Sequence, residues 1–292
     1  ADALAAASAG ISVYAAEADP LTAALAAANA EALGLADRLR VHHAAAADVD
    51  LTGVDAVFCD PARRRAGTGR RVFDPAAYSP PWAFVAALPD RVARTVLKLA
   101  PGIDHALLPA GAEGEWVSVD GEVVEAAFWC GPLARAPRRA TVLRGDTVAE
   151  LTGPGTARAP VGPLRPFLYD PDGAVVRAHL VAEFAGTVGG TLADPDIAYV
   201  YADAALPTPY ARCLRVVDTL PFSLKRLRTA LRDRGVGRLE ICKRGSALEP
   251  ERLRRDLRLA GPAAATLVLT RVAGAPTALV CEPAGTPGGP AG

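Results

Sequence analysis

Apolar and polar positions follow two periods over the first part of the chain. Short β-prone runs alternate with segments whose apolar residues recur at helical spacing, so strands are expected at 11–15, 38–42, 56–59 and 95–99, and helices at 1–8, 20–35 and 82–88. Gly34 suits the end of the second helix. The segment 63–81 is rich in turn formers and predicts a loop. This alternation predicts an α/β domain with a mostly parallel sheet.

Two hairpins are expected after this domain pattern. The β-prone runs 116–119 and 123–129 flank Asp120-Gly121, a dipeptide that suits a type I′ turn. A second hairpin is expected over 140–151, and Pro, Gly and Arg then become frequent up to 166, which predicts a linker. Antiparallel strands of this kind are common at the edge of a mixed sheet.

The C-terminal part has its own pattern of elements. It predicts a helix over 174–187, a strand over 197–201, and from 214 onward strand, helix, strand, helix and strand, with helices at 222–234 and 250–259 and strands at 238–243 and 265–272. The end of the chain after Pro283 is rich in Gly and Pro, and we expect it to be disordered.

Composition limits the class of protein. Hydrophobic residues make up 51% of the 292 residues and charged residues 22%, which is enough for a buried core. The formal net charge is zero, which argues against a protein that binds nucleic acid over its whole surface, since such a protein would carry an excess of positive charge. The five cysteines are far apart and show no zinc-binding spacing, so we expect reduced thiols, no metal site and a cytoplasmic protein.

No targeting or membrane segment is visible in the sequence. No apolar run approaches the roughly 20 residues that span a bilayer, and the start lacks the basic and apolar regions of a signal peptide. The chain begins with Ala1 inside a predicted helix rather than with Met. We therefore expect a fragment whose upstream part is missing.

Two acidic residues follow predicted strands in the first domain. Glu17 closes the strand at 11–15, and Asp48 follows the strand at 38–42. In open α/β sheets, ligands bind at the carboxyl ends of the strands, where an acid can accept hydrogen bonds from ribose hydroxyls or an adenine amino group. Helix-capping and turn-capping roles are the alternatives for these two carboxylates.

The sharpest signal is Asp60-Pro61, which an apolar strand delivers to the same edge. A carboxylate here can hold the N–H groups of an acceptor and take a proton, and proline fixes the backbone. Arginines on the following loop suit phosphate groups, and the alternative for them is a solvated surface loop. The candidate substrate-binding residues of this loop are Arg63, Arg64, Arg70 and Arg71.

The C-terminal part carries a local basic excess. From Phe222 to Arg258 there are 12 Lys and Arg against 5 Asp and Glu, an excess of seven positive charges. Such a stretch can neutralise phosphates without reading sequence, whereas solvated helix faces are the alternative. We expect the turn after the strand 238–243 to contact a nucleic-acid backbone. The candidate RNA-binding residues are Lys225, Arg228, Lys243 and Arg244.

The four histidines are not grouped in sequence. His42 and His43 are adjacent, but His105 and His179 stand far from them and from each other. A histidine-based nucleophile system or a metal site has little support from this spacing. Ordinary structural roles are expected.

In order and at strand ends, Glu17, Asp48 and Asp60-Pro61 resemble the pattern of class I S-adenosylmethionine-dependent methyltransferases. The likeness sharpens with the runs Asp60-Pro61-Ala62-Arg63-Arg64, Phe73 to Trp82 and Leu97 to Asp104. These are similar to a bacterial group of such enzymes with a C-terminal THUMP-like domain. The group implies a Rossmann-like methyltransferase core over 1–160, a small ferredoxin-like α+β segment over 161–213, a THUMP-like domain over 214–283 and a tail over 284–292.

The resemblance implies S-adenosylmethionine as cofactor, but the group's name does not specify a substrate. The basic C-terminal part, together with the analogy to THUMP domains that bind RNA in RNA-modifying enzymes, favours methylation of a nucleobase in tRNA or rRNA. The base would leave its stack to reach the methyl group. Glu17 would hold the ribose, Asp48 the adenine and Asp60-Pro61 the acceptor. The implied cofactor-binding residues are Asp2, Glu17, Asp48 and Asp60, the catalytic pair is Asp60 and Pro61, and Lys98 joins the substrate-binding set.

The sequence departs from the family pattern in two places. An acidic residue and glycines in a strand-to-helix loop should precede the first helix, and Asp2 is the expected last trace of that motif. Amino-group methyltransferases often have an aromatic residue after the Asn/Asp-Pro-Pro motif, where this chain has Ala62 and Arg63. Phe58, Phe73, Tyr78 and Trp82 are alternatives for base stacking, although each is also a typical core residue.

Rival functions come from different classes. In one, only the basic C-terminal part is active, as a non-catalytic RNA-binding protein. In another, Glu17 binds the ribose of NAD in an oxidoreductase, although no Tyr–Lys or His–Asp proton relay is evident. Methylation of a protein or a small molecule is a further alternative.

Overall fold

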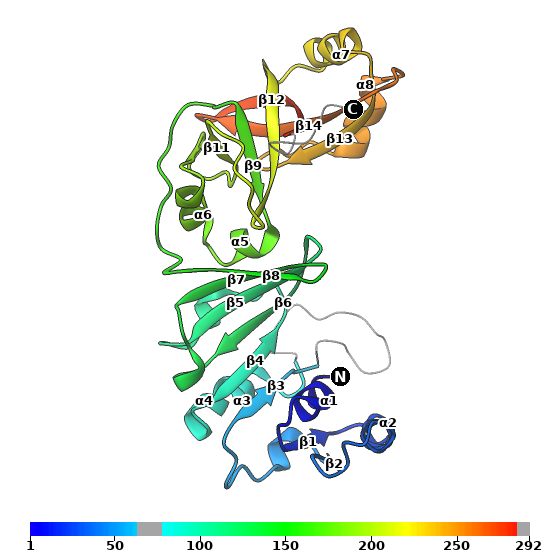
Figure 1. Cartoon of the computed structure of the whole chain (residues 1–292), viewed down its shortest axis with the longest axis vertical. Coiled ribbons are helices and arrows are strands. Elements are labelled where there is room, and N and C mark those ends of the chain that lie inside the picture. The colour runs from blue at the N-terminus through cyan, green and yellow to red at the C-terminus, as the bar shows by residue number, and fades with distance from the viewer. Residues whose placement is uncertain (63–77, 285–292) are drawn as a thin grey trace. The chain divides into compact units, whose positions relative to one another are not determined.

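The computed structural model describes residues 1–62 and 78–284, and these form two compact units. One unit consists of Ala1–Lys98 with Cys130–Leu133, and the other of Leu99–Trp129 with Ala134–Gly292. The ribbon in Figure 1 labels their helices and strands. The predicted loop arginines Arg63, Arg64, Arg70 and Arg71 lie outside the described residues.

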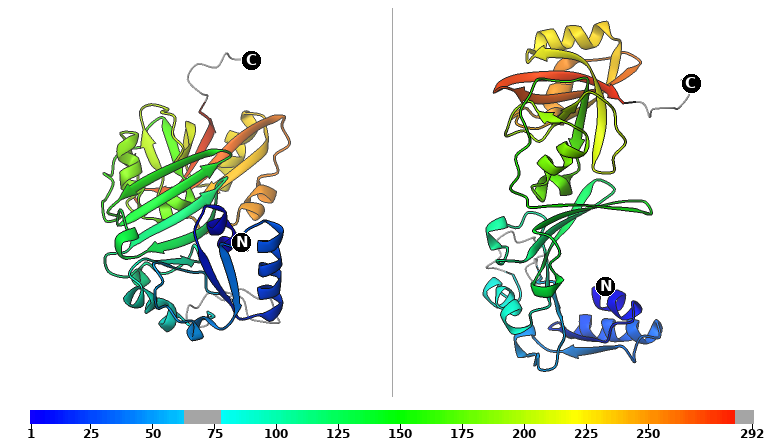
Figure 2. Two further views of the ribbon diagram at one scale, coloured as in Figure 1. Left: turned by 60° about the horizontal axis from the view of Figure 1, so that its bottom comes forward. Right: turned by 60° about the vertical axis from the view of Figure 1, so that its left-hand side comes forward.

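The first unit alternates helices and strands as predicted. Its elements are α1 (Asp2–Ser8), β1 (Val13–Glu17), α2 (Pro20–Ala32), β2 (Leu39–His43), η1 (Ala46–Asp48), β3 (Val57–Cys59), α3 (Trp82–Ala86), α4 (Leu88–Arg91), β4 (Thr95–Leu99) and η4 (Gly131–Leu133). Asp19 caps α2, because its carboxylate accepts a hydrogen bond from the backbone N–H of Thr22 at 2.7 Å. Helix α2 lies along the β1–β2 pair (Figure 2).

Both pairs of neighbouring strands in this unit are parallel, as the α/β pattern predicts. β1 pairs with β2 and β3 pairs with β4. Among the described strands, β1 and β2 form a sheet of their own, so the two pairs do not share one sheet. Each pair nevertheless has one edge at which both strands end, and this edge is where a parallel sheet binds ligands.

The second unit begins with four strands in the order β6-β5-β7-β8, after the short helix η3 (His105–Leu107). Both predicted hairpins are present, and Asp120 and Gly121 adopt φ of 49° and 89°, the positive values of a type I′ turn. β7 adds in parallel to β5, so the first hairpin is not at an edge. The strands are β5 (Glu113–Val119), β6 (Glu122–Trp129), β7 (Arg138–Arg144) and β8 (Thr147–Gly153).

A seven-stranded sheet completes the second unit, in the order β10-β11-β9-β12-β15-β14-β13. β9 and β12 pair across the predicted boundary at 213, and that boundary remains a prediction. The elements are β9 (Phe167–Pro171), α5 (Gly173–Arg177), α6 (Val181–Thr187), β10 (Thr191–Leu192), β11 (Val200–Ala202), β12 (Ala211–Pro221), α7 (Leu224–Asp233), β13 (Val236–Lys243), α8 (Pro250–Leu257), β14 (Ala263–Val272) and β15 (Ala275–Pro283).

Helices α7 and α8 are amphipathic and cover one face of this sheet. Leu227 and Leu231 of α7 and Leu253 and Leu257 of α8 are buried in a cluster with residues of β13, β14 and β15. The outward faces of both helices are consequently left to charged side chains.

Two predictions for this region are wrong. The helix expected over 174–187 is two helices, because His179 between them has a φ of 61°, which breaks helical geometry. β15 was not expected, and it contains Pro276 although proline is uncommon inside sheets. β15 is nevertheless central in the sheet, between β12 and β14.

Candidate functional site

The carboxyl edge of the β3–β4 pair brings three predicted site residues together. Cys59 pairs with Leu97 in parallel register, so the next residues, Asp60 and Lys98, are neighbours. The Lys98 ammonium lies 3.4 Å from a carboxylate oxygen of Asp60 and 3.1 Å from one of Asp2. One half-buried ammonium group thus links the first residue of α1 to the acid that follows β3. We call Asp2, Asp60 and Lys98 the lysine-centred cluster.

The backbone beside this cluster is fixed on both sides. Pro61 is buried directly after Asp60. Ala62 then forms an antiparallel bridge with Ser79, with N–H···O distances of 2.8 and 3.1 Å. The bridge holds the Asp60-Pro61 backbone in place, because both ends of the intervening segment are tied together at this point.

Glu17 and Asp48 belong to the corresponding edge of the β1–β2 pair. Glu17 ends β1 opposite His43 of β2, and one of its carboxylate oxygens accepts the Asp19 N–H at 2.9 Å. Asp48 is exposed at the end of η1. Among the described residues, no hydrogen bond or ion pair links these two acids to the lysine-centred cluster. The structure therefore gathers Asp2, Asp60 and Lys98, with Pro61 next to Asp60, and leaves Glu17 and Asp48 at a separate strand pair.

The donor and acceptor chemistry of these edges fits an adenosine-containing cofactor. Exposed carboxylate oxygens can accept hydrogen bonds from ribose hydroxyls and from an adenine amino group. The lysine-centred cluster has a different character, since the ammonium group compensates two acids and restrains Asp60. It is suited to orienting an acceptor group rather than to holding a sugar.

The predicted RNA-binding residues of the C-terminal part are mostly engaged within the protein. Arg244 donates to Asp170 at 2.8 Å and lies over the ring of Tyr199. Lys243 donates to the carbonyl of Leu248 at 2.9 Å. Arg228 donates to the carbonyl of Asp256. These three side chains join the elements of the second unit, which is a structural role.

Basic side chains are exposed instead on the outward surface of the two helices. Lys225 is exposed as predicted, and its neighbours on α7 and α8 share this exposure. Within this group, Arg252 lies 3.9 Å from the carboxylate of Asp256, and Arg232 donates to the carbonyl of Arg258 at 3.1 Å. We call this set the basic helix face: Lys225, Arg226, Arg232, Arg252 and Arg255.

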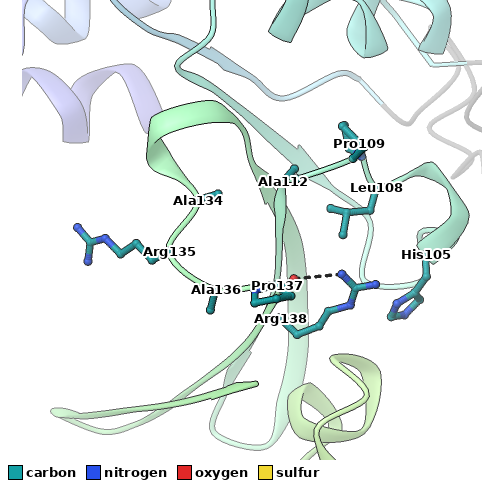
Figure 3. Close-up of a pocket in the computed structure, with 11 residues that line it drawn as sticks. His105, Leu108, Pro109, Ala112, Ala134, Arg135, Ala136, Pro137 and Arg138 are labelled. Atoms are coloured by element: carbon teal, nitrogen blue, oxygen red, sulfur yellow. Dashed lines mark hydrogen bonds between the residues drawn. The ribbon is translucent and has the colours of Figure 1, made fainter. Parts of the chain in front are cut away.

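The sequence did not indicate a cluster of rings and positive charge in the second unit. His105 stacks on Trp116 and on His179, with ring centroids 4.4 and 3.9 Å apart. His105 and Arg138 also line a pocket of about 590 Å³, shown in Figure 3. These residues come from separate elements, so no spacing in the sequence could have revealed them.

The described part of the chain gives no sign of a metal centre or a membrane span. No set of three or more His, Cys, Asp or Glu within it is arranged to hold an ion. None of its helices is long and apolar enough to cross a bilayer. The five cysteines are all free thiols.

Comparison with known proteins gives three consistent results. Residues 211–283 match the family model described as THUMP domain-like. Two proteins of Mycobacterium tuberculosis, from different strains and each named an uncharacterized S-adenosylmethionine-dependent methyltransferase, are 39% identical over 91% of this chain and 74% of their own length. The crystal structure of a proposed methyltransferase from Porphyromonas gingivalis W83 matches 92% of this chain and 70% of its own, with a TM-score of 0.67 and 20% identity. That last likeness concerns the fold.

Proposed function

The chain belongs to the S-adenosylmethionine-dependent methyltransferase family of its two mycobacterial relatives, and from this premise we propose that it methylates a nucleobase of tRNA or rRNA. The observation that carries the proposal is the lysine-centred cluster next to buried Pro61. Methyl transfer is a direct displacement, so a catalyst of this class acts mainly by orienting the acceptor.

We assign the binding of the cofactor to Asp2, Glu17, Asp48 and Asp60. When bound, S-adenosylmethionine supplies an electrophilic methyl group on a sulfonium centre. Glu17 accepts hydrogen bonds from the ribose hydroxyls and Asp48 from the adenine amino group. Their carboxylates are available for this, since both stand at the carboxyl edge of the β1–β2 pair.

Asp60 and Pro61 are the proposed acceptor site. The Asp60 carboxylate accepts a hydrogen bond from the acceptor N–H and takes its proton as the nitrogen attacks. Lys98 keeps this carboxylate oriented through its 3.4 Å ion pair, and the ring of Pro61 fixes the φ torsion of Pro61 itself. A base in RNA has to leave its stack to reach such a site.

The basic helix face is the proposed contact to the RNA backbone. It lies on the segment that matches the THUMP domain-like model. Exposed Lys and Arg side chains neutralise phosphates and displace counterions without reading sequence. In this proposal residues 1–160 form the methyltransferase core, and the segment 161–213 connects this core to the THUMP-like domain over 214–283. The THUMP-like domain binds the RNA backbone.

Calorimetric titration of S-adenosylhomocysteine into the full-length protein tests the cofactor assignment. We expect binding that is lost or weakened at least tenfold in Glu17→Ala, since a carboxylate that accepts hydroxyl hydrogen bonds contributes about 1.5–3 kcal/mol. Glu31→Ala, an exposed acid on α2, is the matched control and should bind normally. NAD serves as the competing ligand, and binding of NAD alone would make the protein an oxidoreductase candidate.

Methyl transfer to RNA tests the substrate assignment. Total tRNA and rRNA are incubated with the enzyme and labelled S-adenosylmethionine, and the modified nucleoside is identified by mass spectrometry. Asp60→Asn should lower kcat by roughly 10²–10⁴-fold, a larger effect than its weakening of S-adenosylhomocysteine binding, because Asp60 is proposed both to hold the acceptor and to contact the cofactor. Asp55→Asn, exposed before β3, should leave kcat unchanged. Label transfer to protein or small molecules, but to no RNA, would refute the substrate assignment and leave the enzyme class intact.

A further inference from the structure

The pocket in the second unit has an unusual distribution of charge. It is lined by the 105–112 loop and the segment 134–138, and none of its lining residues belongs to the lysine-centred cluster (Figure 3). His105, Arg135 and Arg138 contribute positive or ionisable groups, and the lining contains no carboxylate. Its volume of about 590 Å³ lies in the range typical of small-molecule sites.

Two nitrogen atoms at this pocket are buried without a partner. Arg138 donates to the carbonyl of Pro137 at 3.0 Å, but its Nε finds no acceptor among the described residues. Nδ1 of His105 is likewise buried and unpaired in that part of the chain. Buried polar atoms in proteins almost always have a hydrogen-bond partner, so two at one pocket indicate that a ligand supplies the acceptors.

No acidic group in the described residues balances Arg138. The guanidinium makes no ion pair there, in contrast to its neighbour Arg139, which pairs with three glutamates. Burial lowers the pKa of Arg138. Burial also lowers the pKa of His105 and of His179, and the positive charge of Arg138 adds to this effect, while Asp104 opposes it at His105. The lining of the pocket itself contains no carboxylate.

The rings beside the pocket are held rigidly. Trp116 is 1% exposed and donates its indole N–H to the carbonyl of Pro101 at 3.0 Å. His105 lies between Trp116 and His179. The plane of its ring makes an angle of 13° with the Trp116 ring and 7° with the His179 ring, so the three rings are nearly parallel. His179 reaches this stack from a left-handed backbone conformation, which costs a non-glycine residue about 1 kcal/mol. The imidazole is therefore preorganised at the pocket.

We propose that this pocket binds a phosphate group, with Arg138 and His105 as its hydrogen-bond donors. A guanidinium with an unused N–H matches the oxygen geometry of phosphate, and the neutral imidazole of His105 donates a second hydrogen bond in the tautomer that carries its proton on Nδ1. A cation is disfavoured at this place, because Arg138 would repel it. The remaining volume accommodates a nucleoside attached to the phosphate.

The primary test measures the effect of inorganic phosphate on thermal stability. The protein is unfolded at constant ionic strength and pH in chloride and in increasing phosphate. We expect a saturable rise in Tm, because a ligand that binds only the folded state stabilises it by mass action. Arg138→Gln should weaken phosphate affinity at least tenfold, which follows from about 1.5–3 kcal/mol for a charge-assisted hydrogen bond. The exposed Arg158→Gln variant should keep the full response.

Further measurements identify the source of the phosphate. If adenosine 5′-monophosphate binds more tightly than phosphate, the ligand is a free nucleotide. If instead a short single-stranded RNA loses affinity in Arg138→Gln, the ligand is the nucleic-acid backbone. Arg138→Lys keeps the positive charge but lacks Nε, and it is the control for misfolding of the glutamine variant. Its phosphate-dependent rise in Tm should lie between that of the wild type and that of Arg138→Gln. The absence of a phosphate-dependent Tm rise, or its persistence in Arg138→Gln, would overturn the proposal.

Discussion

At the scale of single residues, the structure contains a buried charge network that the sequence did not indicate. The Glu113 side chain is fully buried and that of Glu115 nearly so, and Arg139 lies 2.6 Å from the first and 3.5 Å from the second. Glu113 also accepts the backbone N–H of Arg135 at 2.7 Å, and Glu115 accepts the indole N–H of Trp129 at the same distance. The guanidinium is thus shared between two buried carboxylates, which makes it hard to replace.

Arg139→Met is expected to destabilise the protein by about 3–5 kcal/mol, because it leaves buried carboxylates without compensation. Urea unfolding at neutral pH measures this change. Arg215→Met provides the matched control, since Arg215 and its partner Glu282 are each about half exposed, at 54% and 50%, and an exposed pair contributes at most about 1 kcal/mol. Equal losses of unfolding free energy in the two variants would contradict the expectation that the buried network contributes more than the exposed ion pair.

The ring stack predicts a pH dependence of stability. Burial, together with the positive charges of His179 and Arg138, lowers the pKa of His105 to about 4, against the opposing effect of Asp104. His105 in the unfolded chain is protonated below about pH 6.5, whereas in the folded chain it is protonated only near pH 4. The free energy of unfolding therefore keeps its full value above pH 6.5 and decreases as the pH falls toward 4. Because the His105 ring is partly exposed to solvent, we expect the free energy of unfolding to decrease by roughly 1–2 kcal/mol over this pH range.

Comparison of wild type with His105→Phe isolates this contribution, because phenylalanine keeps the stacking and removes the titration. Urea midpoints at pH 7.5 and 5.0 should differ less in the variant than in wild type. His179 titrates in the same direction, since its pKa is also lowered, and it contributes equally to both proteins. Identical pH dependence in both would show that His105 is not the responsible group.

At the scale of elements, α7 and α8 separate apolar side chains that face the sheet from charged side chains with other roles. Positions that face the sheet are leucines, whereas Arg228 and Arg232 of α7 donate to the backbone carbonyls of Asp256 and Arg258. The exposed basic side chains of both helices, Arg232 among them, make up the basic helix face. Basic residues counted along the sequence therefore include some that are engaged within the protein.

Replacing Lys225 and Arg226 by glutamine should weaken RNA binding uniformly across sequences. Each lost phosphate contact reduces the slope of log K against log salt by about 0.7 for single strands, so the double variant should lose about 1.4. Fluorescence anisotropy with labelled single-stranded RNA at several salt concentrations gives the slope. Arg94 and Arg158, both exposed, are replaced together as the control. An unchanged slope in the first variant would place the RNA elsewhere.

At the scale of the whole molecule, the sequence was informative where periodicity and turn chemistry agree. β4 spans Thr95–Leu99 as predicted, and the Asp120-Gly121 turn is where the pattern placed it. Propensity failed at His179, which combines a left-handed backbone conformation with stacking of its ring on His105. The ion pair of Asp60 with Lys98 was not predicted, although both residues belong to the ends of predicted strands, and the pocket with Arg138 depends on residues that only tertiary structure brings together.

The shared sheet predicts how the C-terminal part can be isolated. A fragment of residues 160–284 retains the pairing of β9 with β12 and should unfold cooperatively as a monomer. A fragment of 211–283, the range of the family match, loses β9 and leaves the edge of β12 unpaired, so it should aggregate or melt at lower temperature. Size-exclusion chromatography and thermal unfolding compare them. Equal behaviour would show that β9 is dispensable.

The bridge between Ala62 and Ser79 has a consequence for how such enzymes diverge. Because the two residues pair directly, whatever the chain inserts between them starts and ends at one fixed point beside Asp60 and Pro61. Doubling the length of such a closed insertion costs only about 0.6 kcal/mol of chain entropy. An insertion of a different length between these two residues is therefore expected to cost little stability and to leave the backbone of the proposed acceptor site, Asp60 and Pro61, in place.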